Sequence, residues 1–215
     1  MKRIKIGTRM EIGMLSVGMY ATNCYVVATP QGAFLVDPGA NARAISAAIA
    51  QMGTQVSDIV FTHSHDDHMG AGYDMVARTG AETYAHPLDK KLIEDPWFEG
   101  RKLPIPGVRV DHTISDGDTL TLAGLQWKVL HTPGHTIGSI CLYNEPEPGS
   151  QEPPVLLSGD TLFNAGIGRT DFEGGSVSQM TKSLKRLMKL PGNTVVLSGH
   201  GPATTIAAEK RNLGL

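Results

Sequence analysis

Short apolar runs separated by turn residues make up the first part of the chain. Each run has the length of one β-strand, and the last of them ends at the turn signature Asp37-Pro38-Gly39. This pattern predicts antiparallel strands joined by short turns at residues 3–7, 12–18, 24–28 and 33–36.

The apolar period then becomes helical. Between residues 42 and 52 apolar side chains recur three or four positions apart, and Gly53 follows, which predicts a helix that ends there. The same reasoning predicts strands at 58–62, 83–85, 118–122, 126–131, 139–143, 154–158 and 194–198, and helices at 71–78 and 177–189. The chain thus repeats a plan of strands followed by a helix. We predict one α/β domain over 1–215, with two sheets packed face to face and helices on the outer faces.

Residues 86–115 are less regular, because four prolines interrupt any long element. Trp97 and Phe98 lie among charged residues in this segment. We expect this segment to form either a wall or lid of a substrate pocket, or a surface loop whose aromatic side chains pack against the body of the protein.

Three histidines and two aspartates occur in residues 62–68 (THSHDDH), directly after a predicted strand. Such crowding is costly unless a cation holds the groups together, and imidazole and carboxylate are ligands of zinc, manganese and iron. On an extended turn His63 and His65 point the same way, whereas Asp67 and His68 face a second point. So many ligands from one short segment indicate two metal ions. The plain alternative is a polar loop, but such loops favour Gly, Pro, Asn and Ser.

Three further predicted strands each end in a possible ligand. His135, Asp160 and His200 all follow such a strand, and a glycine that permits a tight turn precedes each of them. Adjacent strand ends in a sheet lie only about 5 Å apart, so these residues converge on one rim. Each is weak alone, because Gly-Asp and Gly-His pairs are common in turns. Together with residues 62–68 they predict a metal centre.

The candidate ligands divide into two groups. We predict His63, His65 and His135 for one ion, Asp67, His68 and His200 for the second, and Asp160 as a bridge between them. One position on each ion stays open. A water bridging two cations about 3.5 Å apart then loses a proton near neutral pH and becomes a nucleophile, while either metal polarises a carbonyl. Asp67 and Asp160 are therefore predicted to be catalytic as well. Metal ions with a purely structural role would instead have every coordination position filled by protein ligands.

Composition narrows the expected partners. The formal net charge is −2, from 19 basic and 21 acidic side chains, which favours neither nucleic acid nor a membrane surface. No apolar stretch approaches a membrane span. Cys24 and Cys141 are far apart and each lies in an apolar run, which indicates buried thiols and a reducing cytoplasm. We expect a small-molecule substrate and a monomer or small homo-oligomer.

Two other polar residues have alternative roles. Asp37 either belongs to a plain turn or accepts a hydrogen bond from a metal ligand. His131 either orients a ligand imidazole or satisfies backbone groups at a strand end.

Four segments resemble the motifs of the metallo-β-lactamase superfamily, and the likeness covers nearly the whole chain. They are residues 62–68 (THSHDDH), 132–138 (TPGHTIG), 158–163 (SGDTLF) and 199–204 (GHGPAT). The resemblance implies a four-layered αβ/βα sandwich with two mixed sheets and the metals on one rim. Asp160 in the bridging place is similar to the glyoxalase II (hydroxyacylglutathione hydrolase) branch. That likeness implies hydrolysis of a small thioester such as S-lactoylglutathione by a metal-bridging hydroxide, with two divalent ions, zinc first and iron or manganese as alternatives.

One segment departs from glyoxalase II. Those enzymes carry a Lys-x-Tyr triplet that grips glutathione, where residues 169–171 of this chain read Arg-Thr-Asp. Arg169 is predicted to bind a substrate carboxylate through its guanidinium fork. The alternative is a structural pair between Arg169 and Asp171.

Residues 168–172 (GRTDF) are also similar to persulfide dioxygenases. These relatives bind one iron through two histidines and an aspartate. On this chain the corresponding residues are His63, His135 and Asp160. A mononuclear iron dioxygenase is therefore the alternative function.

Overall fold

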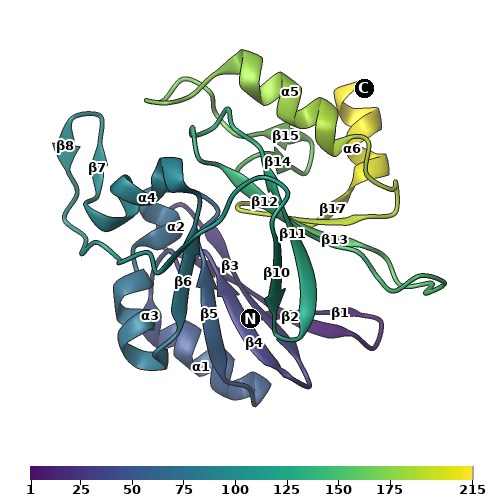
Figure 1. The fold of residues 1–215 in the computed structure, drawn as a ribbon, viewed down its shortest axis with the longest axis horizontal. Coiled ribbons are helices and arrows are strands. Elements are labelled where there is room, and N and C mark those ends of the chain that lie inside the picture. Colours follow the sequence, from purple (N-terminus) through teal and green to yellow (C-terminus); the bar gives the residue numbers. More distant parts are fainter. Residues whose placement is uncertain (215) are drawn as a thin grey trace.

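The computed structural model describes residues 1–214 and arranges them as two sheets packed face to face, with helices outside each sheet (Figure 1). Side-chain alternation along β3 (Thr22–Thr29) explains this order of layers. Cys24 packs in the apolar cluster that includes α1 (Ala42–Met52), whereas its neighbour Tyr25 packs in the cluster shared with the second sheet. Because consecutive side chains of a strand point to opposite faces, β3 is covered by a helix on one face and a sheet on the other.

The first sheet is mixed. In spatial order its strands are β1 (Lys2–Ile6), β2 (Met10–Val17), β3, β4 (Gly32–Val36), β5 (Val56–Val60), β6 (Glu82–Ala85) and β9 (His112–Thr113). The first four pair antiparallel, and β4, β5, β6 and β9 pair parallel. The parallel part directs the C-terminal ends of β4 and β5 to the same edge.

The second sheet is also mixed. In spatial order its strands are β10 (Thr119–Leu122), β11 (Leu125–His131), β12 (Ile140–Asn144), β13 (Val155–Gly159), β16 (Val195–Ser198) and β17 (Thr204–Thr205). Strands β13 and β16 pair parallel, so their C-terminal ends lie side by side. Two small hairpins accompany the sheets: β7 (Trp97–Phe98) with β8 (Arg101–Lys102), and β14 (Leu162–Phe163) with β15 (Gly166–Ile167).

The helices cover the outer faces. Those beside the first sheet include α1 and α3 (Gly72–Thr79), and those beside the second are α5 (Val177–Leu187) and α6 (Ile206–Leu213) (Figure 1). The short α2 (Asp66–Met69) and α4 (Pro87–Glu94) lie on the same side of the molecule as the β7–β8 hairpin.

Apolar packing joins the layers. Between the sheets, the fully buried rings of Phe34 and Trp127 meet edge to face, with centroids 5.2 Å apart. On the outer face of the second sheet, Met180, Leu184 and Leu187 recur at helical spacing along α5 and pack on the strands. The predicted four-layered sandwich with two mixed sheets is confirmed.

The structure adds helices that the sequence pattern does not predict. Helix α4 begins at Pro87, so the expectation that prolines exclude any long element from 86–115 is wrong for the first part of this segment. Proline suits the first helical position, where its missing N–H costs nothing, and the His86 ring accepts a hydrogen bond from Leu88 N (3.3 Å). Helix α6, at the C-terminal end, is capped by Thr205.

Two further observations bear on the predicted setting. Among residues 1–214 no helix is both long enough and apolar enough to cross a membrane. Cys24 and Cys141 are both free and fully buried, as expected.

Candidate metal centre and substrate cavity

Strand ends from both sheets supply the predicted ligands. The segment that carries His63 and His65 follows β5 of the first sheet. In the second sheet Asp160 follows β13, His200 follows β16, and His135 lies between β11 and β12. The structure therefore brings residues that are distant in sequence to one rim, as predicted.

Two glycines allow the strand ends to approach one another. Gly199 N donates a hydrogen bond to Gly159 O (2.8 Å). A Cβ atom on Gly199 would lie 2.0 Å from Asp160 Oδ1, and one on Gly159 would lie 2.5 Å from Thr62 Oγ1. Gly159 also has a φ of +47°, which favours glycine. A side chain at either position would displace a group of the site.

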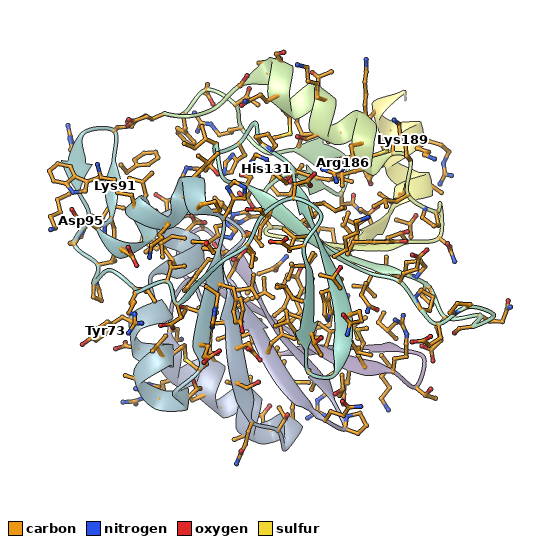
Figure 2. The ribbon with its side chains drawn as sticks, viewed as in Figure 1. Tyr73, Lys91, Asp95, His131, Arg186 and Lys189 are labelled. Atoms are coloured by element: carbon orange, nitrogen blue, oxygen red, sulfur yellow. The ribbon has the colours of Figure 1, made fainter. Side chains whose placement is uncertain are left out.

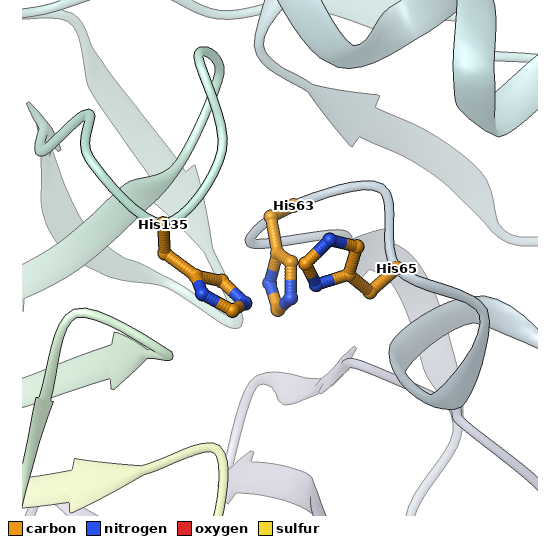
Figure 3. A group of neighbouring side chains, drawn as sticks. All are labelled: His63, His65 and His135. Carbon is orange, nitrogen blue, oxygen red and sulfur yellow. The ribbon is translucent and has the colours of Figure 1, made fainter. Parts of the chain in front are cut away.

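The first ligand group consists of three imidazoles. One ring nitrogen from each of His63, His65 and His135 lies within 4.8 Å of the others, and Figure 3 shows the three rings gathered around one space. This arrangement matches the three-histidine sets that bind zinc and leave a coordination position open.

The second ligand group is Asp67, His68 and His200, whose ligand atoms also lie within 4.8 Å of one another. His200 Nε2 is 3.3 Å from both Asp67 Oδ2 and His68 Nε2. Asp160 lies between the groups, because its Oδ1 is 3.4 Å from His68 Nε2 and its Oδ2 is 3.5 Å from the Nε2 atoms of both His135 and His200.

Hydrogen bonds fix the tautomer of two ligand rings through backbone carbonyls. His135 Nδ1 lies 2.8 Å from Arg169 O, and His200 Nδ1 lies 3.0 Å from Tyr20 O. A carbonyl oxygen only accepts, so both Nδ1 atoms carry a proton. When the ring is neutral, this directs the Nε2 lone pair of each histidine to the site, as a metal ligand requires.

A buried carboxylate performs the same task for two other rings. Asp37 Oδ2 accepts hydrogen bonds from the Thr62 hydroxyl (2.6 Å) and from His68 Nδ1 (2.9 Å). Because the Thr62 hydroxyl donates to Asp37, its oxygen accepts from His63 Nδ1 (3.0 Å). Of the two roles considered for Asp37, the structure shows the acceptor role. Its hydrogen bonds orient two imidazoles, although its position beside His63 and His68 would also suit a ligand.

Unpartnered polar atoms mark the space between the two groups. Among the residues that the structure describes, His63 Nε2, His135 Nε2 and Asp160 Oδ1 are buried and lack a hydrogen-bond partner. Such atoms are rare in folded proteins and call for an ion or another group. Imidazole nitrogen and carboxylate oxygen suit zinc, iron and manganese, so the residues present fit the predicted ions.

Electrostatics differ between the two groups. Burial, together with the imidazole of His135, lowers the pKa of His65 to about 4. Hydrogen bonds to Asp160 and Asp67 raise the pKa of His200 to about 9. Burial alone would raise the pKa of Asp67, but interactions led by its hydrogen bond with His200 outweigh burial and lower it to about 2. At neutral pH His65 is therefore neutral, whereas His200 and Asp67 form an ion pair.

A cavity of about 700 Å³ opens beside the ligands. Apart from the predicted site residues and Asp66, its wall is made of Tyr20, Phe98, Leu103, Phe163, Ile167 and Phe172. Phe98 and Leu103 belong to the irregular segment 86–115, so the expectation of a pocket wall is confirmed for these two side chains. The wall is mainly apolar, as is usual for a small-molecule site.

Arg169 also lines this cavity. Its Nε and Nη2 atoms donate to the two carboxylate oxygens of Asp171, at 2.9 and 2.8 Å, and both side chains are exposed. The structural pair considered for Arg169 is thus formed. A role for Arg169 in binding a substrate carboxylate stays a prediction.

One residue that supports the site, Asp89, carries no clear signal in the sequence. Asp89 of α4 is 1% exposed and accepts hydrogen bonds from Ser64 N (2.9 Å), Thr136 Oγ1 (2.8 Å) and Gly138 N (2.9 Å). It thereby ties together the two segments that carry the first ligand group. Helical position and charge type alone do not distinguish it from a solvent-exposed aspartate.

Of the two roles considered for His131, the structure shows that it satisfies a backbone group at a strand end. Its Nε2 donates to Ile137 O (2.9 Å), and its ring stacks on His86 with centroids 4.1 Å apart. It therefore satisfies a backbone group and does not contact a ligand imidazole through these bonds.

Comparisons with known proteins agree with this geometry. A sequence model of the Metallo-beta-lactamase superfamily matches residues 17–200. The hydroxyacylglutathione hydrolase GloC of Haemophilus influenzae is 31% identical over 212 residues, which cover 94% of this chain and 96% of GloC. The crystal structure of BLEG-1, a B3 metallo-beta-lactamase, has a TM-score of 0.84 at 33% identity over 93% of this chain and 96% of its own. TTHA1623 in a di-iron-bound form has a TM-score of 0.79 at 35% identity, over 93% and 98%.

Proposed function

The chain belongs to the metallo-beta-lactamase superfamily, and we propose that it is a metal-dependent hydrolase of a small thioester, with S-lactoylglutathione as the first compound to test. The position of Asp160 carries this proposal, because its carboxylate contacts histidines of both ligand groups. Similarity to the hydroxyacylglutathione hydrolase GloC along nearly the full chain supports a thioester substrate. Similarity to the di-iron-bound TTHA1623 supports two ions.

The two ligand groups would hold one divalent ion each, with Asp160 between them. We propose zinc first, and iron or manganese as alternatives. When bound, such ions supply a water of lowered pKa and polarise a carbonyl oxygen. Hydrogen bonds to Nδ1 of His63, His68, His135 and His200 hold the opposite nitrogens toward the site.

The chain's own residues would then position the reactants. Asp67 lines the cavity and is ionised at neutral pH, so it can accept a hydrogen bond from the attacking water and orient it. In the proposed reaction the water oxygen bonds to the thioester carbon, the C–S bond breaks, and the thiolate takes up a proton. The apolar part of the wall would hold the acyl or thiol part of the substrate. Asp67 would thus be catalytic by orienting the water, and Asp160 by contacting both ligand groups.

The buried, free thiols of Cys24 and Cys141 support the proposed location in a reducing cytoplasm. We propose a small molecule as the substrate class, since the cavity of about 700 Å³ beside the ligands has a mainly apolar wall.

The test combines metal content with turnover. Freshly purified protein should hold close to two ions per chain by elemental analysis, and it should hydrolyse S-lactoylglutathione or another small thioester. Asp160→Asn and His65→Ala should each abolish turnover while the circular dichroism spectrum stays unchanged. Undiminished hydrolysis in both variants would sink the proposal.

A mononuclear iron dioxygenase acting on a persulfide is the second candidate, and one observation favours it. The three buried, unpartnered atoms of the site belong to His63, His135 and Asp160. Two histidines and one carboxylate are the ligand set of many non-haem iron oxygenases. Oxygen uptake by iron-loaded protein with glutathione persulfide, at close to one ion per chain, would replace the hydrolase by this alternative.

A further inference from the structure

His65 differs from the other four predicted histidine ligands in what holds its ring. The others form a hydrogen bond through Nδ1, to Thr62, Asp37, Arg169 O and Tyr20 O. Within residues 1–214 no hydrogen bond to either ring nitrogen of His65 is found, although its backbone neighbour Ser64 N is bound by Asp89. The loop is fixed, but no polar group sets the ring angle.

Two aromatic rings take the place of that hydrogen bond. The centroid of Phe98 lies 5.6 Å from that of His65 with an interplanar angle of 82°, and Phe172 lies at 5.7 Å and 85°. The two phenyl rings also contact each other, at 5.2 Å and 75°. Edge-to-face pairs at these separations are favourable beyond the area that they bury. His65 is thus packed against two phenyl rings that also contact each other.

Phe172 is itself well supported. The Arg169 guanidinium lies 4.0 Å from the centroid of the Phe172 ring, which is a cation–π contact. The same segment binds the first ligand group at a second point, because Arg169 O accepts the hydrogen bond from His135 Nδ1. Residues 169–172 therefore brace two of the three imidazoles of this group.

Phe98 comes from a different element. It lies on the β7–β8 hairpin, which projects beside α4 away from both sheets (Figure 1). Asp95 lies at the base of this hairpin (Figure 2), where it accepts a hydrogen bond from Trp97 Nε1 (3.1 Å) and pairs with Lys102 Nζ (2.8 Å). Phe98 and Phe172 both line the cavity, so the rings that touch His65 would also touch a substrate.

We propose that Phe98 and Phe172 are positioning residues for His65, so that the apolar cavity wall sets how tightly the first ligand group holds its ion. This inference rests on the metal centre of the proposed function. It assigns to the two rings a task that hydrogen bonds perform at the other histidines. A substrate that presses on the wall then changes the affinity for the ion, and by linkage the ion changes the affinity for the substrate.

The chain contains a matched control. Phe163 lines the same cavity and lies edge to face with His200, at 6.0 Å and 90°. His200, however, is also held by the hydrogen bond from its Nδ1 to Tyr20 O. Loss of the Phe163 ring should therefore leave the orientation of His200 unchanged.

The test is a zinc titration of metal-free protein in competition with a chromophoric chelator. Phe98→Leu and Phe172→Leu keep apolar volume but remove the ring edge, and each should weaken zinc binding about threefold to tenfold. Phe163→Leu should change it by less than about twofold. In a His200→Ala background, which disables the second group, the loss caused by Phe98→Leu should persist. Unfolding temperatures of the metal-free variants, measured alongside, separate this effect from a general loss of structure.

The outcomes distinguish the inference from the function on which it rests. Two ions bound with wild-type affinity in both Phe98→Leu and Phe172→Leu would overturn the inference alone. An equal loss of zinc affinity in Phe163→Leu would overturn the inference too, because ring packing would then matter whether or not the histidine forms a hydrogen bond. Wild-type protein that binds no ion would overturn both the inference and the proposed function.

Discussion

Replacing Asp37 by asparagine should weaken metal binding without unfolding the protein. Asp37 has a φ of +50°, a left-handed conformation that asparagine tolerates better than most residues. The asparagine oxygen can still accept from Thr62 N, as Asp37 Oδ1 does at 2.8 Å. Its NH₂ group then faces the Thr62 hydroxyl and His68 Nδ1, where a carboxylate oxygen had accepted two hydrogen bonds.

The expected loss follows from the tautomer of His68. Facing an NH₂ group, Nδ1 must accept, which places the ring proton on Nε2 and removes the lone pair that the second ligand group needs. The Nδ1 to Oδ2 bond is 2.9 Å long between side chains that are 0% and 2% exposed. A hydrogen bond to a buried charge contributes about 1.5–3 kcal/mol. Loss of it corresponds to a decrease in zinc affinity of about tenfold to hundredfold.

The assay is chelator competition on metal-free Asp37→Asn, with Thr62→Val as the companion variant. Thr62→Val removes the acceptor of His63 Nδ1 but leaves the bond between Asp37 and His68 in place. It should therefore weaken the first ligand group, whereas Asp37→Asn should weaken the second most strongly. Two zinc ions bound to Asp37→Asn with unaltered affinity would refute the tautomer reasoning.

Three other predictions concern protonation, stability and substrate charge. Because the pKa of His200 is raised to about 9, the stabilising charge of its ring is complete below the ordinary histidine pKa and is lost as the pH rises through about 9. The ring proton competes with the metal ion, so calorimetry of zinc binding near pH 7, in buffers of different ionisation enthalpy, should show proton release. Zinc binding without proton release would contradict this. Asp89→Ala leaves three donors unpaired and should lower the free energy of unfolding by about 3 kcal/mol or more in urea titrations, whereas a loss below about 1 kcal/mol would contradict its bridging role. Asp171→Ala frees the Arg169 guanidinium, so KM for a carboxylate-bearing thioester should fall, and it should rise in Arg169→Leu; an unchanged KM in both would exclude a substrate contact.

The predicted ligands could be located from the sequence because each follows a strand end within a few residues. A short apolar run identifies the strand, a glycine marks the turn, and the sheet then brings the ends together, as it does for Asp160 and His200. No long-range information is needed beyond the assumption that the strands pair. The same logic explains why the four-layered architecture was predictable.

The wall of the cavity could not be located in this way. Phe98 and Phe172 lie in irregular segments with no apolar period, and their contact depends on how a hairpin and a distant loop are placed. Asp89 is likewise invisible, because its partners are two backbone N–H groups and a hydroxyl from separate loops. Helix α4 could not be predicted because Pro87 has two opposite meanings. A proline inside a helix breaks it, whereas a proline at the first helical position favours it.

The hydrogen-bond network favours two ions over one. A single iron held by His63, His135 and Asp160 would need a buried acceptor only for the Nδ1 atoms of those two histidines. The structure also maintains the Asp37 bond to the fully buried His68. Burying the Asp37 carboxylate costs free energy, so this hydrogen bond is expected only where the orientation that it gives the His68 ring has a use. Asp67, another member of the second ligand group, accepts a hydrogen bond from the Thr22 hydroxyl (2.7 Å). Thr22→Val should therefore reduce the second zinc affinity and hydrolysis together if two ions act, and should leave a single-iron oxygenase unaffected.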